Sequence, residues 1–112
     1  MQLHISGQHL DLTEAIKKHV HEKLGRLDHY FDRVIDGRVV LKFLSHEKLS
    51  NVVEISVSAP GHDFHAEARD ANMYAAIDQL AEKIDGQVRQ YKEKLQRHRA
   101  GPVAAALATE NE

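Results

Sequence analysis

The sequence contains no cysteine and no tryptophan. Without cysteine, the chain cannot form a disulfide scaffold, a thiolate zinc site or a cysteine nucleophile. It also lacks an apolar run of the 18 or more residues that a membrane-spanning helix needs. Residues 1–6 carry neither the basic region nor the apolar region of a secretory signal. These absences predict a cytoplasmic protein that does not enter a membrane.

Neither sign of charge dominates the composition. Lys and Arg number 15 against 17 Asp and Glu, which gives a formal net charge of −2. This balance excludes a uniformly basic nucleic-acid-binding protein, but it leaves room for a local basic patch. The chain has 112 residues, of which 42% are hydrophobic. That length and content predict one domain with a single modest core.

The first third of the chain changes from the period of a strand to the period of a helix. Residues 2–6 alternate between apolar and polar, as a half-buried strand does. Asp11 and Thr13 are candidate N-caps for the helix that follows. Its apolar side chains fall on one face: Ile16, Val20, Leu24, Leu27 and Phe31. We expect this helix to run to about Arg33 and to be broken by Asp36-Gly37.

The middle of the chain predicts three further strands. Residues 38–43, 53–58 and 64–69 each alternate between apolar and polar side chains. Short loops join them, and Pro60-Gly61 is typical of a hairpin turn. Three successive strands with such short connections form an antiparallel meander.

The final helix has the clearest pattern. Its apolar residues recur every three or four positions: Met73, Ile77, Leu80, Ile84, Val88, Tyr91 and Leu95. Asp70 or Asn72 can cap its start, and we expect it to end near Arg99. We therefore expect an α+β domain over residues 1–99 and a flexible C-terminal tail over residues 100–112.

The order of these elements predicts a two-layer β-α-β-β-β-α sandwich. Each strand has one apolar face and each helix has one apolar stripe, so both helices should cover the same face of a four-stranded sheet. The strand-helix-strand unit at the start favours a parallel first pair of strands.

Enzyme and metal motifs are absent or incomplete. His46-Glu47 begins like a zinc-protease helix motif, but Ser50 stands where the second histidine is required. His62 and His65 are three residues apart, and on a strand they would point to opposite faces. No nucleophile elbow, phosphate-binding loop or dinucleotide fingerprint occurs. We expect no enzymatic activity, no metal site and no cofactor.

Charge along the last helix is unevenly distributed. Residues 70–82 hold three acidic residues and no Lys or Arg, whereas residues 83–99 hold six basic residues and two acidic ones. Complementing the helix dipole explains part of this asymmetry. The dipole acts only within the terminal turns, however, and the basic stretch covers more than four turns. Together with basic residues of the first helix, it predicts a phosphate-binding surface.

Several stretches match one family. They are Met1-Gln2-Leu3 with Ile5 and Gly7, Thr13-Glu14-Ala15, Tyr30-Phe31-Asp32-Arg33, Val39-Val40-Leu41-Lys42, and Met73-Tyr74-Ala75-Ala76-Ile77-Asp78 with Leu80. In these stretches the chain resembles the short form of the ribosome hibernation promoting factor family, which also includes protein Y, the ribosome-associated inhibitor. The resemblance covers residues 1 to about 98.

The resemblance implies a fold similar to double-stranded-RNA-binding domains and binding to 16S rRNA of the ribosome small subunit. The site would lie where mRNA and transfer RNA sit, so that binding blocks translation on idle ribosomes under stress or in stationary phase. By position, the family's phosphate-binding residues correspond to Lys23, Arg26, Arg33, Lys83, Lys92 and Lys94. The basic flanks add Lys18, Arg89 and Arg97 to the expected rRNA-binding set. Gly86 and Gln90 replace basic residues that relatives often carry, which shifts one edge of the patch.

Two functional alternatives stay open within the family and one outside it. The resemblance implies that a short hibernation factor promotes ribosome dimerisation, with ribosome modulation factor as a candidate helper, whereas protein Y stabilises single inactive ribosomes. We favour the first role. Off the ribosome we expect a monomer. Outside the family, the uncovered sheet face could serve as a protein-interaction module. It should show His4, Lys42, Glu54, Ser56, His65, Glu67 and Arg69. That face is mixed in charge and lacks large aromatics, which disfavours a binding hot spot there.

Overall fold

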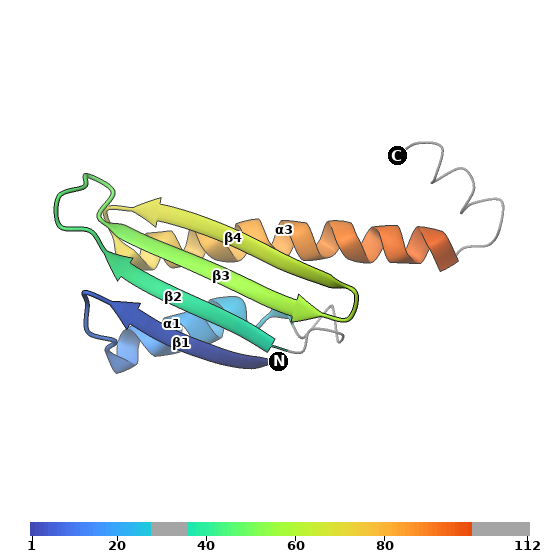
Figure 1. Cartoon of the computed structure of the whole chain (residues 1–112), viewed down its shortest axis with the longest axis horizontal. Coiled ribbons are helices and arrows are strands. Elements are labelled where there is room, and N and C mark those ends of the chain that lie inside the picture. Colours follow the sequence, from blue (N-terminus) through green and yellow to red (C-terminus); the bar gives the residue numbers. More distant parts are fainter. Residues whose placement is uncertain (28–35, 100–112) are drawn as a thin grey trace.

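The structure is a computed structural model that describes residues 1–27 and 36–99, apart from the side chains of residues 97–99. Its elements are β1 (Gln2–Gln8), α1 (Glu14–Leu24), β2 (Asp36–Phe43), β3 (Asn51–Ala59), β4 (His62–Asp70) and α3 (Met73–Arg99) (Figure 1). Phe31, Arg33 and the tail predicted over residues 100–112 lie outside the described residues. Within those residues, no helix is long and apolar enough to cross a membrane.

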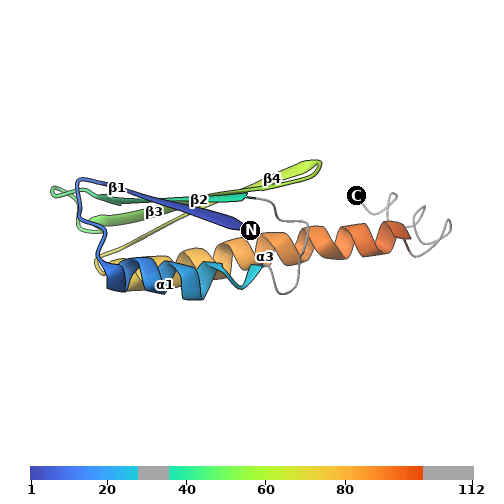
Figure 2. The same ribbon diagram turned by 90° about the horizontal axis from the view of Figure 1, so that it is seen from below.

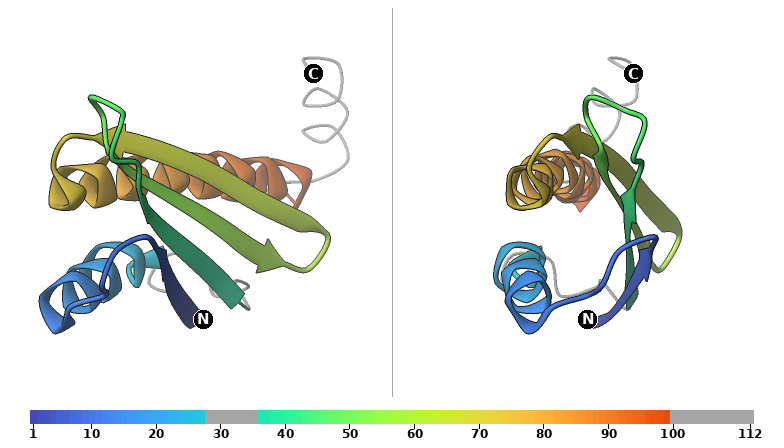
Figure 3. Two further views of the ribbon diagram at one scale, coloured as in Figure 1. Left: turned by 60° about the vertical axis from the view of Figure 1, so that its left-hand side comes forward. Right: turned by 90° about the vertical axis from the view of Figure 1, so that its left-hand side faces the viewer.

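The four strands form one sheet in the order β1-β2-β3-β4. β1 pairs with β2 in parallel, and the other two pairings are antiparallel. Figure 2 shows the sheet as one layer and both helices as the other, and the end-on view in Figure 3 shows α1 and α3 side by side over one face. The predicted two-layer α+β class is therefore confirmed, including the parallel first pair.

The core lies between the sheet and the helices. Strand alternation directs Val39, Leu41 and Ile55 towards the helices, and each is 0% exposed. The predicted apolar stripe of α3 meets them, since Leu80 and Ile84 are also 0% exposed. This shared burial explains why the sheet carries helices on one face only.

The helix α1 is shorter than the sequence predicts. Thr13 caps its start as expected, because the Oγ1 atom accepts a hydrogen bond from the Ile16 N–H at 3.1 Å. The helix ends at Leu24, whereas the prediction extended it to Arg33. Gly25 follows as the C-cap, and its N–H donates to the His21 carbonyl at 3.0 Å. Glycine has low helix propensity, so the apolar period alone overestimates the length.

Asp36-Gly37 was predicted to break the helix and instead opens β2. Gly37 pairs with Leu3 of β1 and is buried. A Cβ added to Gly37 would lie 3.1 Å from both Leu3 Cδ2 and Met1 Sδ. The glycine therefore permits close packing of the chain's first residues against β2, which the Asp-Gly pattern alone does not reveal.

The helix α3 has the predicted bounds and the predicted caps. Asn72 Oδ1 accepts hydrogen bonds from the N–H groups of Tyr74 and Ala75, at 2.8 and 3.3 Å. Asp70 Oδ1 in turn accepts from the Asn72 N–H at 2.9 Å. At its other end α3 projects past the turn between β3 and β4 (Figure 1).

Candidate nucleic-acid interface

The two flanks of α3 face different neighbours, and the predicted rRNA-binding residues divide between them. One flank lies beside α1, and the other lies beside β4, which is an edge strand of the sheet (Figure 3). Lys23, Arg26 and Arg89 gather on the α1 side. Lys83 and Lys94 lie on the β4 side. The predicted single surface is thus two surfaces separated by the width of one helix.

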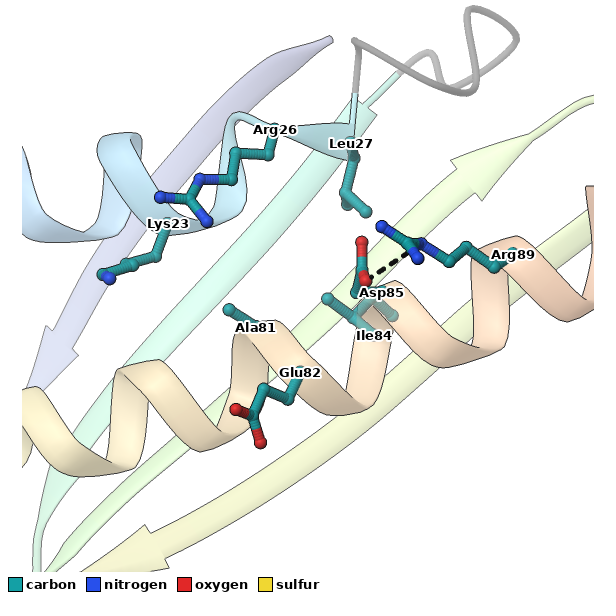
Figure 4. Close-up of a pocket in the computed structure, with 8 residues that line it drawn as sticks. All are labelled: Lys23, Arg26, Leu27, Ala81, Glu82, Ile84, Asp85 and Arg89. Atoms are coloured by element: carbon teal, nitrogen blue, oxygen red, sulfur yellow. Dashed lines mark ion pairs between the residues drawn. The ribbon is translucent and has the colours of Figure 1, made fainter.

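A groove runs between α1 and α3, with a volume of about 440 Å³. It is lined by Lys23, Arg26, Leu27, Ala81, Glu82, Ile84, Asp85 and Arg89 (Figure 4). Arg89 Nε lies 3.2 Å from Asp85 Oδ2. Lys23 Nζ lies 3.9 Å from Asp78 Oδ1, just outside the groove.

Two carboxylates reduce the positive potential of this groove. Glu82 and Asp85 stand on α3 opposite Lys23 and Arg26, which come from α1 and the turn after it (Figure 4). A polyanion that entered the groove would meet negative charge as well as positive charge. The groove therefore suits contact with phosphates at its exposed rim better than a deep phosphate site.

On the other flank, side chains of α3 cover the free edge of β4. Lys83 Nζ donates to the Glu67 carbonyl at 2.8 Å, and Gln87 Nε2 donates to the His65 carbonyl at 2.8 Å. Exposed strand edges are a liability that proteins commonly cover with side chains or helices. Lys83, predicted as a phosphate ligand, therefore also has a structural contact that sequence reasoning missed.

The end of this flank forms a shallow hollow of about 190 Å³. It is lined by His62, Phe64, Gln87, Gln90, Tyr91 and Lys94. The His62 and Tyr91 rings stack, with centroids 4.5 Å apart and planes 16° apart. Sequence analysis placed Tyr91 in the apolar stripe of the last helix and considered His62 only beside His65, so it did not bring the two rings together.

The remaining predicted residues lie elsewhere. Lys18 is exposed on α1, and Lys92 is half-buried on α3. Arg97 lies on the last turn of α3, but its side chain is not among those described, and Arg33 lies outside the described residues. Because the stack with His62 places Tyr91 at the β3–β4 hairpin, residues 92–99 follow beyond the sheet.

The uncovered sheet face carries several close pairs of oppositely charged side chains. His4 and Asp36 lie 2.9 Å apart, Lys42 and Glu54 lie 3.3 Å apart, and Arg69 and Glu67 lie 3.6 Å apart. The Ser56 hydroxyl and His65 Nδ1 are 3.1 Å apart. Because these charges are neutralised by neighbours, the face has the mixed character that the sequence predicts.

Histidines are numerous, and two of them each pair with a single carboxylate, His4 with Asp36 at 2.9 Å and His19 with Asp78 at 2.8 Å. His62 lies on the helix side of β4, while His65 is on the open face. Among residues 1–27 and 36–99, no three His, Asp or Glu side chains are close enough together to hold a metal ion.

Comparison with known proteins places the chain in a family. Residues 3–96 match the family described as Sigma 54 modulation protein / S30EA ribosomal protein. A ribosome hibernation promoting factor from Acidithiobacillus ferridurans is 64% identical over 78 residues, which are 70% of this chain and 100% of that protein. The chain belongs to the ribosome hibernation promoting factor family. The role of this family is hibernation of ribosomes and is non-catalytic.

Solved structures of similar proteins agree with this family assignment. A ribosomal subunit interface protein from Coxiella burnetii superposes with a TM-score of 0.74 at 27% identity, covering 83% of this chain and 99% of that one. The N-terminal domain of Thermus thermophilus protein Y superposes with a TM-score of 0.71 at 33% identity, covering 81% and 99%. The α+β fold is therefore shared across the hibernation factor family and protein Y.

Proposed function

We propose that this chain binds 16S rRNA of the small ribosomal subunit in the cytoplasm, where mRNA and transfer RNA sit on active ribosomes. Occupying that region would block translation on ribosomes that idle under stress or in stationary phase, and would promote their dimerisation. Membership of the hibernation factor family supports this proposal. The name of the Coxiella burnetii neighbour, a ribosomal subunit interface protein, supports a site between the ribosomal subunits.

The observation that carries the proposal is the basic end of α3. Residues 92–99 contain four Lys and Arg residues and one acidic residue, and they follow the point where the sheet ends. Within the described part of the chain, neither β4 nor α1 lies over this segment (Figure 1), which favours contact with RNA there. Lys and Arg side chains supply most of the affinity of proteins for nucleic-acid phosphates by releasing counterions.

The hydrogen bond made by Lys83 determines which lysines are replaced in the test. Replacing Lys83 would also remove its hydrogen bond to the Glu67 carbonyl, so a loss of binding would be ambiguous. Lys92 and Lys94 lie beyond that contact, and alanine at both positions preserves helix propensity. Lys48, exposed in the loop between β2 and β3, is the matched control for removal of positive charge.

The experiment measures binding to purified small subunits between 50 and 200 mM salt. With about 6–10 phosphate contacts, affinity of the native chain should fall by about 10³–10⁵ over this range, taking duplex DNA as the guide. The double variant Lys92→Ala/Lys94→Ala should bind more weakly and reduce the salt slope by about two, while Lys48→Ala should match the native chain. Binding that does not depend on salt would contradict the proposal.

One further variant tests the protein-interaction alternative. Arg38 is exposed on the open sheet face, between His4 of β1 and Ser56 of β3. Arg38→Ala should leave binding to small subunits nearly unchanged. If it weakened binding more than Lys92→Ala/Lys94→Ala, the binding surface would be the sheet.

Sedimentation of whole ribosomes distinguishes the two roles within the family. The chain is mixed with ribosomes, once with ribosome modulation factor and once without it. A chain that promotes pairing should increase the fraction of ribosome dimers. A protein Y-like chain should instead hold ribosomes as single particles. We expect dimers, and accumulation of single inactive ribosomes would assign the protein Y-like role.

A further inference from the structure

The hollow at the start of β4 contains a pair of stacked rings that does not belong to the predicted set of basic residues. His62 is the first residue of β4, and its ring stacks on Tyr91 with a centroid separation of 4.5 Å. Phe64 meets both rings edge-on, at 4.6 Å from His62 and 5.4 Å from Tyr91. The three rings form one cluster between the hairpin and α3.

The inner and outer members of this cluster differ in exposure. Phe64 is buried and Tyr91 is half-buried, whereas His62 is exposed. Since Tyr91 covers one face of the imidazole and Phe64 lies at an angle to it, the exposed area of His62 is its opposite face and rim. The outermost surface of the cluster is therefore a flat, accessible ring at the mouth of the hollow.

We propose that His62 is a stacking platform for an unpaired base of RNA, with Lys94 binding the phosphate of the same strand. This inference rests on the proposed function and specifies how one nucleotide is held. Bases of single-stranded RNA stack on aromatic side chains, histidine included. A ring already stacked on Tyr91 is held in orientation, so little freedom is lost when a base is added.

The surrounding side chains suit a nucleotide. Tyr91 and Lys94 are three residues apart on α3 and are therefore neighbours on its surface. Gln90 lines the same hollow and is exposed, and its amide offers both a donor and an acceptor to a base edge. Asp63, the nearest acid in sequence, points to the other face of β4 because strand side chains alternate.

A different reading is that the His62–Tyr91 pair only holds the hairpin against α3. The two readings predict different results for His62→Leu and His62→Phe. Both variants keep an apolar contact with Tyr91, but only phenylalanine keeps a flat aromatic face. A purely structural role would show in thermal stability and would not distinguish the two variants in binding.

The experiment measures binding of the native chain and its variants to small subunits, together with melting temperatures. His62→Leu should weaken binding by about 5- to 150-fold, the range reported by alanine substitution at stacking sites. His62→Phe should bind like the native chain, and His62→Trp should bind at least as well because its ring is larger. His46→Leu, in the exposed loop after β2, is the matched control and should have no effect.

The salt dependence of binding distinguishes stacking on His62 from phosphate binding by Lys94. His62→Leu should leave the salt slope unchanged, because stacking releases no counterions, whereas Lys94→Ala should reduce the slope by about one. If the native chain binds and His62→Leu binds equally well, the stacking site is wrong and the proposed function stands. Equal losses for His62→Leu and His62→Phe, with lowered melting temperatures, would also reject the platform. If the native chain does not bind small subunits, both proposals fail.

Discussion

His19 of α1 and Asp78 of α3 join the two helices directly, with 2.8 Å between His19 Nε2 and Asp78 Oδ1. The His19 ring also meets Tyr74 edge-on, with ring centroids 5.1 Å apart. Together with the Lys23–Asp78 ion pair at 3.9 Å, this polar contact fixes how one helix lies along the other. It connects residues 59 positions apart in the chain.

Removing this contact should cost a modest amount of stability. Asp78→Ala removes the acceptor for His19 and the ion-pair partner of Lys23, but Asp78 is half exposed to solvent, which screens both interactions. We expect the free energy of unfolding to fall by about 1 kcal/mol in urea titrations. Glu82→Ala, one helical turn later on α3, is the control, since Glu82 makes no ion pair within the described part of the chain. A larger loss for Glu82→Ala would contradict the importance of the His19–Asp78 contact.

The centre of the core should be far more sensitive. Leu80 is 0% exposed between the sheet and the helices, so Leu80→Ala leaves a cavity and should lower the free energy of unfolding by about 2–5 kcal/mol. Leu49, which is 51% exposed in the loop before β3, provides the same substitution without burial. Leu49→Ala should change stability by less than about 0.5 kcal/mol. Similar values for the two variants would mean that the core is not where the structure places it.

Two glycines should respond to alanine with opposite signs. Gly86 is exposed in the middle of α3, and an added Cβ would meet nothing within 4 Å, so Gly86→Ala should stabilise the protein by about 0.5–1 kcal/mol. Gly61 has φ +78° in the β3–β4 turn, where an L side chain is strained. Gly61→Ala should therefore destabilise by about 1 kcal/mol. Urea titration of both variants checks the signs, and destabilisation by Gly86→Ala would show a contact on the outer face of α3.

Deleting residues 101–112 should leave the melting temperature unchanged. The segment contains no periodic apolar face in the sequence, so it has little with which to pack on the domain. If the proposed function holds, the deletion should change ribosome pairing more than it changes binding to the small subunit. A fall of several degrees in the melting temperature would show that the segment docks on the domain.

Local patterns were sufficient to predict most of the fold. Strand alternation, the apolar stripe of α3 and the caps at Thr13 and Asn72 depend on neighbours in sequence, and each agrees with the structure. The end of α1 and the strand role of Gly37 were predicted wrongly. The apolar period passes over Gly25, which caps α1, and the strand role of Gly37 depends on its pairing with β1, which no local period records.

Less of the candidate site could be predicted from the sequence, because the site depends on contacts between residues that are far apart in the chain. Helical spacing identified the basic residues of α3, but it could not show that α1 and β4 separate them into two surfaces. The bond from Lys83 to the Glu67 carbonyl joins residues 16 positions apart, and the His62–Tyr91 stack joins a strand to a helix. Such pairs can be identified only once the β3–β4 hairpin is known to pack beside α3.

If the chain binds RNA as proposed, the uneven charge of α3 affects how it approaches the RNA. Acidic residues gather in its first half and basic residues in its second half, while the open sheet face is neutralised in place. The molecule therefore carries an electric dipole along its long helix. The field of a polyanion exerts a torque on this dipole, which turns the basic end of α3 towards the polyanion before contact. Since the torque acts over about 10 Å at 0.1 M salt, it should favour productive collisions and raise the association rate at low ionic strength.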